Sequence, residues 1–331
     1  KIGLFWLRDD FRITKNYGLA EATKNHDQVV VFYLYKKSIF KNQEAQKWWL
    51  SKSLLNFKKK LNVFNINIEI IETDSFKVFF DKLLKKRDIS IYWNKVYEPD
   101  YLKFDQHLIK DLTIKNISYK IFKGNTLNEI NEVKKSDGTP FKVFTPFWRN
   151  AENYYIEKIP LKEKIIKKCL KKKNYFQNCI NPNEILPKKN WFKKFEKIWS
   201  PDEESALKEL NIFIKNRIVN YSDDRNFPNK FGTSKLSPFI KFGQIHVEKI
   251  WDECLRANKK RIETSKFLAE IGWREFNHTL INNFPHMLKN NYYKKFDKFP
   301  WEKNAKFLLA WKKGLTGYPI VDAGMRELYS T

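Results

Sequence analysis

This chain of 331 residues is poor in the residues that build metal sites and disulfide frameworks. It has 3 cysteines, Cys169, Cys179 and Cys254, and none of them stands in a CxxC pair or another metal-type spacing. Its 5 histidines show no HExxH pattern or other zinc-site spacing. We therefore expect no metal and no disulfide framework, and reduced thiols predict a cytoplasmic protein.

Long apolar runs and glycine-rich loops are missing as well. No apolar stretch approaches the roughly 20 residues that cross a bilayer, and the N-terminus enters a strand pattern at once, which predicts neither a membrane segment nor a signal peptide. No glycine-rich phosphate loop is present, which argues against a nicotinamide dehydrogenase or a kinase. The chain begins without Met and stops at Thr331 in mid-pattern, so we expect both ends to be trimmed.

Acidic residues are few relative to basic ones. The chain has 64 Lys and Arg against 38 Asp and Glu, which leaves a formal charge of +26. A positive field attracts polyanions, and nucleic acid is the commonest of these. A general bias of the source proteome towards Lys explains the same charge, so the charge alone does not establish DNA binding. Aromatic residues, in contrast, are abundant at 16%.

The order of apolar patterns predicts two kinds of architecture along the chain. Short β-branched or aromatic runs alternate with helical patterns in the first third, at residues 2–7, 29–34, 66–70 and 89–93. We predict an α/β domain with a doubly wound parallel sheet over residues 1–130 and a connector over 131–199. An all-α domain over 200–331, incomplete at its C-terminus, follows, and its first helix is predicted to have Ser200 as cap and Pro201 in the first turn.

Two segments of the helical half carry chemistry. In residues 220–238, small hydroxyl residues surround a glycine at a predicted helix start, where backbone N–H groups and O–H donors suit a pyrophosphate. An ordinary capped helix is the alternative. In residues 267–277, Glu270, Trp273, Arg274 and Asn277 recur at steps of three and four and so share a helix face. A purely structural core would not choose this mixture, because unpaired buried charge is costly, although a surface salt-bridge face remains possible.

Several motifs together resemble the photolyase and cryptochrome family, most closely a cyclobutane pyrimidine dimer photolyase. They occur in the family's order, at residues 5–12, 92–99, 138–148, 220–238, 267–277 and 316–328. The resemblance implies FAD as cofactor and a second, antenna chromophore that is either a folate or a deazaflavin. Asp100 and Tyr101 stand where folate-binding relatives carry an Asn-Glu pair, so the antenna pigment stays open.

The same resemblance assigns residues to the site. The implied FAD contacts are Tyr221, Thr233, Ser234, Lys235, Leu236, Ser237, Phe267 and Arg274. The implied DNA contacts are Arg225, Glu270, Trp273, Arg274 and Asn277. Glu270 and Trp273 would also act in catalysis by holding the flipped lesion, and Trp301 would be the surface end of an electron-transfer chain of tryptophans.

The implied function is light-driven repair of cyclobutane pyrimidine dimers in DNA by electron transfer from reduced FAD. Glu270 favours this lesion, because (6-4) photolyases and animal-type cryptochromes carry Gln there. A (6-4) photolyase, a cryptochrome blue-light receptor and a flavin-free DNA-binding module are the alternatives. The expected partner is ultraviolet-damaged DNA, and we expect a monomer with no obligate protein partner and no membrane association.

Overall fold

The computed structural model describes residues 1–156, 163–168, 174–257 and 264–330. The chain divides into two compact units. The first unit comprises Lys1–Lys188 and Ser200–Pro285, and the second comprises Lys189–Trp199 and His286–Thr331. The boundaries between these units differ from the predicted domain boundaries at residues 130 and 199. The three predicted domains stay a prediction from the sequence.

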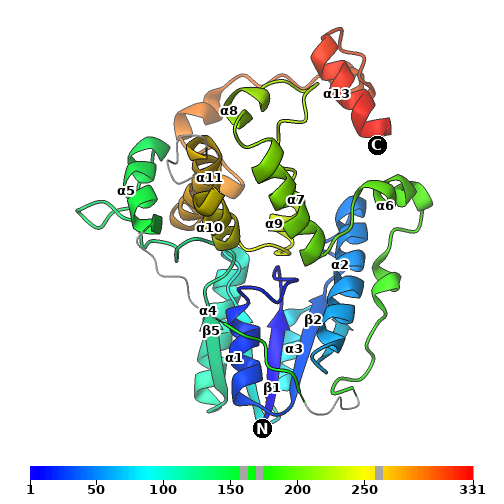
Figure 1. Ribbon diagram of the computed structural model, residues 1–331, viewed down its shortest axis with the longest axis vertical. Coiled ribbons are helices and arrows are strands. Elements are labelled where there is room, and N and C mark those ends of the chain that lie inside the picture. The colour runs from blue at the N-terminus through cyan, green and yellow to red at the C-terminus, as the bar shows by residue number, and fades with distance from the viewer. Residues whose placement is uncertain (157–162, 169–173, 258–263, 331) are drawn as a thin grey trace. The chain divides into compact units, whose positions relative to one another are not determined.

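The first unit is built on a parallel sheet of five strands in the order β3-β2-β1-β4-β5 (Figure 1). The strands are β1 (Ile2–Leu7), β2 (Val29–Tyr35), β3 (Asn67–Glu72), β4 (Ile89–Asn94) and β5 (Ser118–Phe122). All residues of β2 and β4 are buried, as their continuous apolar sequence predicts for strands covered on both faces. The strand order reverses between β1 and β4, and open α/β sheets bind ligands beyond the carboxyl ends of the strands at such a reversal.

Helices cover both faces of this sheet. Leu4 and Trp6 of β1 pack in one core with Phe80 and Leu108. These two residues belong to α3 and α4, and the helices between the strands are α1 (Tyr17–Asn25), α2 (Glu44–Asn62), α3 (Phe76–Leu83) and α4 (Pro99–Ile114). Phe5 points to the other face, where its ring lies so close to Gly18 of α1 that a Cβ there would come within 2.8 Å of it. The predicted doubly wound α/β fold is confirmed.

The rest of the first unit is mainly helical. Its α-helices are α5 (Phe144–Ile156), α7 (Glu203–Asn216), α8 (Tyr221–Asp224), α9 (Ser237–Lys241), α10 (Val247–Ala257) and α11 (Ser265–Asn283). The predicted cap of the helix near residue 200 is wrong by two positions. Asp202 caps α7 by accepting a hydrogen bond of 2.7 Å from the backbone N–H of Ser205, while the hydroxyl of Ser200 donates to the Asp202 carboxylate.

The loop after β1 is fixed against the helical part of the same unit. Gly243 has a φ of +64°, and a Cβ at this position would lie 1.8 Å from the backbone oxygen of Asp9. The buried Arg12 donates from Nη1 to the Gly243 carbonyl oxygen at 2.8 Å. Glu203 of α7 accepts 2.9 Å hydrogen bonds from two successive backbone N–H groups of the loop, those of Ile13 and Thr14. These contacts set the position of Asp9 at the end of β1.

The second unit contains α6 (Phe195–Ile198), α12 (Ala305–Lys313) and α13 (Pro319–Ser330). Gly314 ends α12 in the left-handed conformation, at a φ of +65°. Asp322 then accepts hydrogen bonds from the backbone N–H groups of Thr316 and Gly317, at 2.8 and 3.0 Å, and so closes the turn before α13. These hydrogen bonds give the motif at residues 316–328 a structural role, the closing of the turn before α13.

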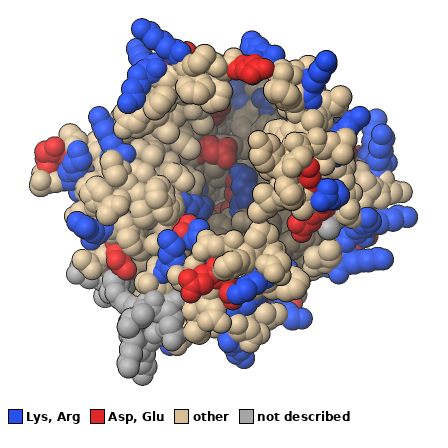
Figure 2. Space-filling view, turned by 90° about the horizontal axis from the view of Figure 1, so that it is seen from above, with Lys and Arg blue, Asp and Glu red and all other residues tan. Residues whose placement is uncertain are grey.

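Among the described residues, no helix combines the length and the apolar character that crossing a membrane requires. Lys and Arg side chains spread around the visible face of the molecule and do not gather in one patch there (Figure 2). Short 3-10 turns complete the described structure, at Pro182–Ile185, Asn190–Lys194, Pro285–Leu288 and Lys294–Lys298.

Candidate functional site

A cavity of about 390 Å³ opens at the carboxyl ends of β1 and β4, the point where the strand order reverses. Asp9, which follows β1, and the residues 95–98 that follow β4 form its sheet side. Its helical side comes from α8, α9 and α11. We call this hollow the strand-end cavity, and all of it lies within the first unit.

One face of α11 lines the strand-end cavity. Its lining residues are Phe267, Glu270, Ile271, Arg274 and His278. The predicted face paired Glu270 and Arg274 with Trp273 and Asn277, and the last two do not line the cavity. At about 100° per residue, Trp273 lies about 60° from Glu270 on the side opposite to Ile271 and Arg274. Of the four residues predicted to share one functional face, Glu270 and Arg274 line the cavity, whereas Trp273 and Asn277 do not.

Trp273 points towards α5. Its ring stacks on Phe144 with the centroids 3.8 Å apart and the planes at 11°, and 42% of the residue is exposed. Gly272 brings the two helices together, since a Cβ there would lie 2.2 Å from the ring of Trp148. The structure therefore places Trp273 in an exposed aromatic stack with Phe144, outside the lining of the strand-end cavity. Asn277 is exposed.

Glu270 and Arg225, two of the predicted DNA contacts, are direct partners. Arg225 Nη1 donates to Glu270 Oε1 in a close ion pair of two half-buried side chains. The hydrogen bond to Glu270 raises the pKa of Arg225. Lys266, one turn before Glu270 on α11, lies 4.0 Å from the same oxygen. The Glu270 carboxylate, which lines the cavity, is thus already paired with a cation, Arg225, whose side chain is partly exposed to solvent.

The strand-end cavity contains fixed positive charge. Lys241 of α9 lies 3.1 Å from Glu98 and 3.4 Å from Asp9, and the Asp9 carboxylate in particular raises the pKa of Lys241. Burial lowers the pKa of Arg274, whose Nη1 lies 3.2 Å from Glu275. Burial also lowers the pKa of His278 to about 3, so its ring is neutral at physiological pH. Lys95, Lys241 and Arg274 are therefore the cationic side chains of the cavity wall, which also carries the carboxylates of Asp9, Glu98 and Glu270.

The predicted FAD segment reaches the cavity with some of its residues only. Ser234 and Ser237 line it, and so does Tyr221, which is buried and packs edge-on against Phe267 with the ring centroids 5.3 Å apart. Leu236 is buried under the start of α9. Thr233 and Lys235 are exposed and do not line the cavity. Lys235 adopts a left-handed backbone conformation, with a φ of +53°. It lies in the turn between Ser234 and Ser237, the two serines that line the cavity.

Sequence reasoning missed several cavity residues. Asp9, Lys95 and Glu98 follow strands whose carboxyl ends meet at the strand-order reversal, and this signal could have found them. Lys241 lies four residues after Ser237 and so shares its helix face, a pattern that was readable in the sequence. His278 had no signal, because its burial depends on how α11 packs.

Trp301 belongs to the second unit. It is 72% exposed and packs against Phe299, with the ring centroids 4.7 Å apart. Its predicted role in electron transfer stays a prediction. Within the described part of the chain, no three His, Cys, Asp or Glu side chains cluster in a way that could hold a metal ion.

Comparison with known proteins gives consistent matches. The family profile described as DNA photolyase matches residues 3–164, and the one described as the FAD binding domain of DNA photolyase matches residues 267–331. A deoxyribodipyrimidine photo-lyase of Agrobacterium fabrum is 32% identical over 98% of this chain and 68% of its own length. The chain belongs to the DNA photolyase family.

The photolyase fold extends over almost the whole chain. The crystal structure of a class III photolyase from Agrobacterium tumefaciens superposes with a TM-score of 0.86 at 31% identity, over 99% of this chain and 68% of that one. Cryptochrome-2 of Arabidopsis thaliana, 28% identical, matches 99% of the chain, which spans 56% of the cryptochrome. The predicted family and photolyase enzyme class are confirmed, and the predicted FAD cofactor agrees with the FAD-domain match, which covers α11 from Phe267 onwards.

Proposed function

We propose that this photolyase repairs cyclobutane pyrimidine dimers in DNA and that the strand-end cavity holds its FAD. The observation that carries the proposal is the meeting of Glu270 and Arg274 with Ser234 and Ser237 around one cavity. These residues come from two motifs 30 to 40 positions apart in the sequence. A carboxylate, a guanidinium and hydroxyl groups in one hollow suit a cofactor with a diphosphate and a polar ring edge.

The side chains of the cavity fit FAD. Ser234 and Ser237 offer hydroxyl donors, and Lys241 and Arg274 offer positive charge for the diphosphate. Gly232 lets the segment approach α8 closely, since a Cβ there would lie 2.6 Å from the backbone of Asp224. Phe267 gives the ring system an apolar neighbour. Bound in its reduced form, FAD supplies the light-excited electron that splits the cyclobutane ring.

The lesion would be held at the cavity by residues that touch the bases and the DNA backbone. A fused dimer pairs and stacks poorly, which lowers the cost of flipping it out of the duplex. Glu270 can accept hydrogen bonds from the pyrimidine N–H groups, and Arg225 can then turn from Glu270 towards a phosphate. The exposed ring of Trp273 offers a stacking surface beside the cavity, worth about 1–3 kcal/mol per stacked base.

Repair of irradiated oligo(dT) tests the proposal. The full chain with reduced FAD should remove cyclobutane dimers in blue light and leave them intact in the dark. Equal dimer loss with and without illumination would contradict a photolyase. A duplex that contains one (6-4) photoproduct, treated in parallel, distinguishes the lesions: repair of this substrate alone would make the protein a (6-4) photolyase.

A cryptochrome is the second candidate, because Cryptochrome-2 of Arabidopsis thaliana matches 99% of this chain. For this function we expect light-induced absorbance changes of the flavin without loss of either lesion. The antenna chromophore, the monomeric state and the cytoplasmic location remain predictions from the sequence.

A further inference from the structure

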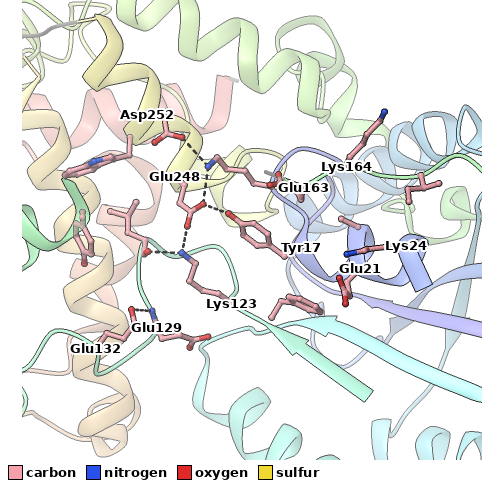
Figure 3. A pocket seen from close by; sticks show the side chains of 17 residues that line it. Tyr17, Glu21, Lys24, Lys123, Glu129, Glu132, Glu163, Lys164, Glu248 and Asp252 are labelled. Atoms are coloured by element: carbon pink, nitrogen blue, oxygen red, sulfur yellow. Dashed lines mark hydrogen bonds and ion pairs between the residues drawn. The ribbon is translucent and has the colours of Figure 1, made fainter. Parts of the chain in front are cut away.

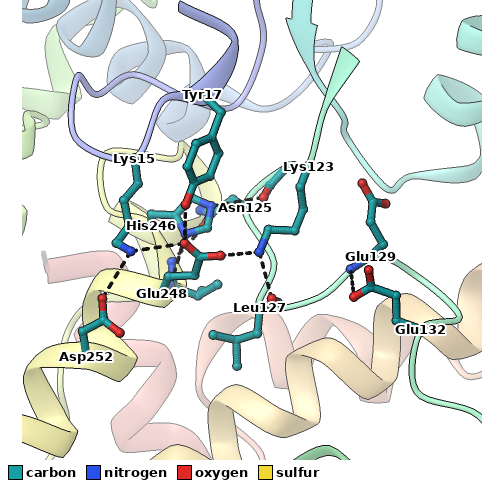
Figure 4. Close-up of polar contacts among 12 residues, drawn as sticks. Lys15, Tyr17, Lys123, Asn125, Leu127, Glu129, Glu132, His246, Glu248 and Asp252 are labelled. Atoms are coloured by element: carbon teal, nitrogen blue, oxygen red, sulfur yellow. Dashed lines mark hydrogen bonds and ion pairs between the residues drawn. The ribbon is translucent and has the colours of Figure 1, made fainter. Parts of the chain in front are cut away.

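A second hollow of the first unit shows charged side chains that bind one another. It has a volume of about 740 Å³ and shares no lining residue with the strand-end cavity. Four lysines and six carboxylates line it, so its walls carry an excess of negative charge (Figure 3). Glu248 holds two of these lysines: Lys15 Nζ lies 3.3 Å from Oε2, and Lys123 pairs closely with Oε1 (Figure 4). Because an excess of carboxylates repels a polyanion, we expect contacts with DNA on another part of the unit.

The loop between α8 and α9 has the opposite composition. Its residues 225–235 include three basic residues and two phenylalanines and no acidic residue. We call these residues the aromatic–basic loop. Residues 226–231 are all exposed, and the exposed fraction is 50% for Phe227 and 79% for Phe231. A single apolar side chain on a surface needs no explanation, but aromatic rings interleaved with cations are the groups with which proteins hold nucleic-acid strands.

The aromatic–basic loop starts and ends beside the strand-end cavity. At its start, Arg225 forms the ion pair with Glu270, which lines the cavity. Near its end, Ser234 lines the same cavity. Phe231 precedes Ser234 by three residues. An extended chain spans at most about 3.6 Å per residue, so the two Cα atoms are at most about 11 Å apart. The more exposed ring of the loop is therefore held near the place that the lesion would occupy.

Hydrogen bonds fix the backbone of this loop. The backbone N–H of Lys230 donates to the carbonyl oxygen of Phe227 at 3.0 Å and closes a turn. Arg217 donates from Nη1 to the carbonyl oxygen of Thr233 at 3.0 Å. Gly232 is buried against α8. An aromatic side chain on a fixed backbone has little conformational freedom left to lose when it binds, which favours a stacking contact.

The two lysines of the loop have different neighbours. Lys230 Nζ pairs with Asp224 at 2.6 Å. Lys235 is exposed and lies outside the lining of the strand-end cavity, and its Nζ is 5.1 Å from the ring centroid of Phe231. A cation over an aromatic ring at an exposed site is held only weakly, so Lys235 can move to a phosphate while a base takes its place on the ring. The family resemblance implied a contact of Lys235 with FAD, whereas its position outside the cavity suits a phosphate of DNA.

We propose that Phe231 stacks on a base that the lesion has left unstacked and that Lys235 binds a neighbouring phosphate. The inference rests on the proposed function, which brings dimer-containing DNA to the strand-end cavity. In an intact duplex the neighbours of each base cover both of its faces, so no face is free for the ring. A dimer that leaves the helix uncovers the faces of the bases around it. Phe231 thus adds selectivity for damaged DNA, whereas Lys235 adds affinity for any duplex.

Binding in the dark tests the stacking contact. The full chain, saturated with FAD, is titrated with three fluorescent duplexes: one with a cyclobutane dimer, one intact, and one without a lesion but with two unpaired thymines. Phe231→Ala and Phe231→Leu should weaken binding of the first and third about fivefold or more and leave binding of the intact duplex unchanged. Phe231→Trp should bind all three like the native chain. Unchanged affinity of Phe231→Ala for the first and third duplexes would overturn the proposal, and so would full affinity of Phe231→Leu.

Ile114→Ala is the matched control, because Ile114 is 81% exposed and ends α4. Since α4 follows β4 and leads to the parallel strand β5, Ile114 lies at the amino edge of the sheet, opposite to the strand-end cavity. This variant should bind all three duplexes like the native chain. Thermal unfolding is measured on both variants. A lower melting temperature of Phe231→Ala, with unchanged DNA affinities, would mean that the ring packs within the protein and would contradict its role.

Lys235→Asn tests the phosphate contact, since Asn tolerates the left-handed backbone of this position. The variant should weaken binding of damaged and intact duplexes by the same factor and lower the slope of log affinity against log salt by about one. Lys115→Asn, at the exposed residue after Ile114, should change neither quantity. An unchanged slope, or a loss of FAD affinity in its place, would refute the assignment of Lys235.

Failure of this inference and failure of the proposed function give different results. If the native chain does not prefer the dimer duplex to the intact one, the proposed function fails, while the duplex with unpaired thymines still measures stacking on Phe231. If the native chain repairs dimers in light and Phe231→Ala binds them equally well, the assignment of the aromatic–basic loop alone is wrong.

Discussion

If Glu270 binds the lesion as proposed, its ion pair within the protein competes with that binding. Its carboxylate already pairs with Arg225, and both side chains are only half-buried, so the pair can open without leaving a charge buried. Opening would offer an acceptor to the bases and a guanidinium to the DNA backbone. In the proposed function this ion pair would hold both groups ready for a ligand, and at its exposure it contributes little stability on its own.

We expect Glu270→Gln to weaken binding of dimer-containing DNA by about tenfold while binding of undamaged DNA changes little, because the amide accepts more weakly and leaves Arg225 unpaired. Fluorescence anisotropy with matched damaged and undamaged duplexes measures both affinities. Glu253→Gln, which removes the partner of Lys249 on α10, is the control. An equal loss for both duplexes would mean that Glu270 does not discriminate the lesion.

His278 provides a test of burial at the cavity. Burial first, then the charges of Arg274 and Lys241, lower its pKa to about 3, against about 6.5 in the unfolded chain. Between these values the unfolded chain binds the proton more readily, so stability falls as the pH drops from 6.5 towards 3. This loss amounts to about 2 kcal/mol between pH 6.5 and 5.

The variant His278→Asn should lack this part of the pH dependence. Urea unfolding of the native protein and the variant at pH 7 and pH 5 gives the two differences in unfolding free energy. If both proteins lose the same stability between these pH values, His278 is not buried in the neutral form.

At the scale of elements, α11 shows how far the sequence predicts the site. The spacing of residues 267–277 correctly predicted a helix, and Glu270 and Arg274 line the cavity from one side of it. The sequence could not fix the rotation of this helix, because Gly272 lets it dock against Trp148 and turns Trp273 onto Phe144. The apolar runs predicted β1 to β4, because strands covered on both faces carry continuous apolar sequence. The fifth strand, β5, was not predicted, since it lies at the edge of the sheet and its residues are exposed or half-buried.

The junction of the β1 loop with the loop after α9 is the element contact that positions Asp9. Gly243→Ala should therefore destabilise the protein by more than the roughly 1–2 kcal/mol that a left-handed backbone costs an L-residue, because the new methyl group meets the Asp9 backbone. It should also lower FAD affinity through the shift of Asp9 and Lys241. Thermal unfolding and flavin fluorescence report the two effects.

Gly138→Ala is the matched control, because Gly138 also has a positive φ, +77°, but a Cβ there would meet nothing within 4 Å. This variant should show the backbone cost alone and normal FAD affinity. If the two variants lose the same stability, the close approach at Gly243 does not hold the loop.

At the scale of the whole molecule, we expect charge to govern the encounter with DNA and the strand-end cavity to govern selectivity for the lesion. The chain has a formal charge of +26, and Figure 2 shows Lys and Arg side chains at many points of the face in view, so we expect phosphate contacts to supply a general attraction. Contact with six phosphates would lower the affinity about 10³-fold between 50 and 200 mM salt. Titrations at several salt concentrations should show this fall for damaged and undamaged DNA alike, with a nearly constant ratio between them. An affinity independent of salt would assign binding to contacts other than phosphate.

The central claim is that FAD occupies the strand-end cavity, and the affinity of the full chain for FAD tests it most directly. Ser237→Asp places a negative charge on the cavity wall, whereas Ser222→Asp places the same charge on an exposed position outside the lining. Flavin fluorescence titration should show at least about tenfold weaker binding for Ser237→Asp and unchanged binding for Ser222→Asp. Equal affinities of both variants and the native chain would contradict the claim.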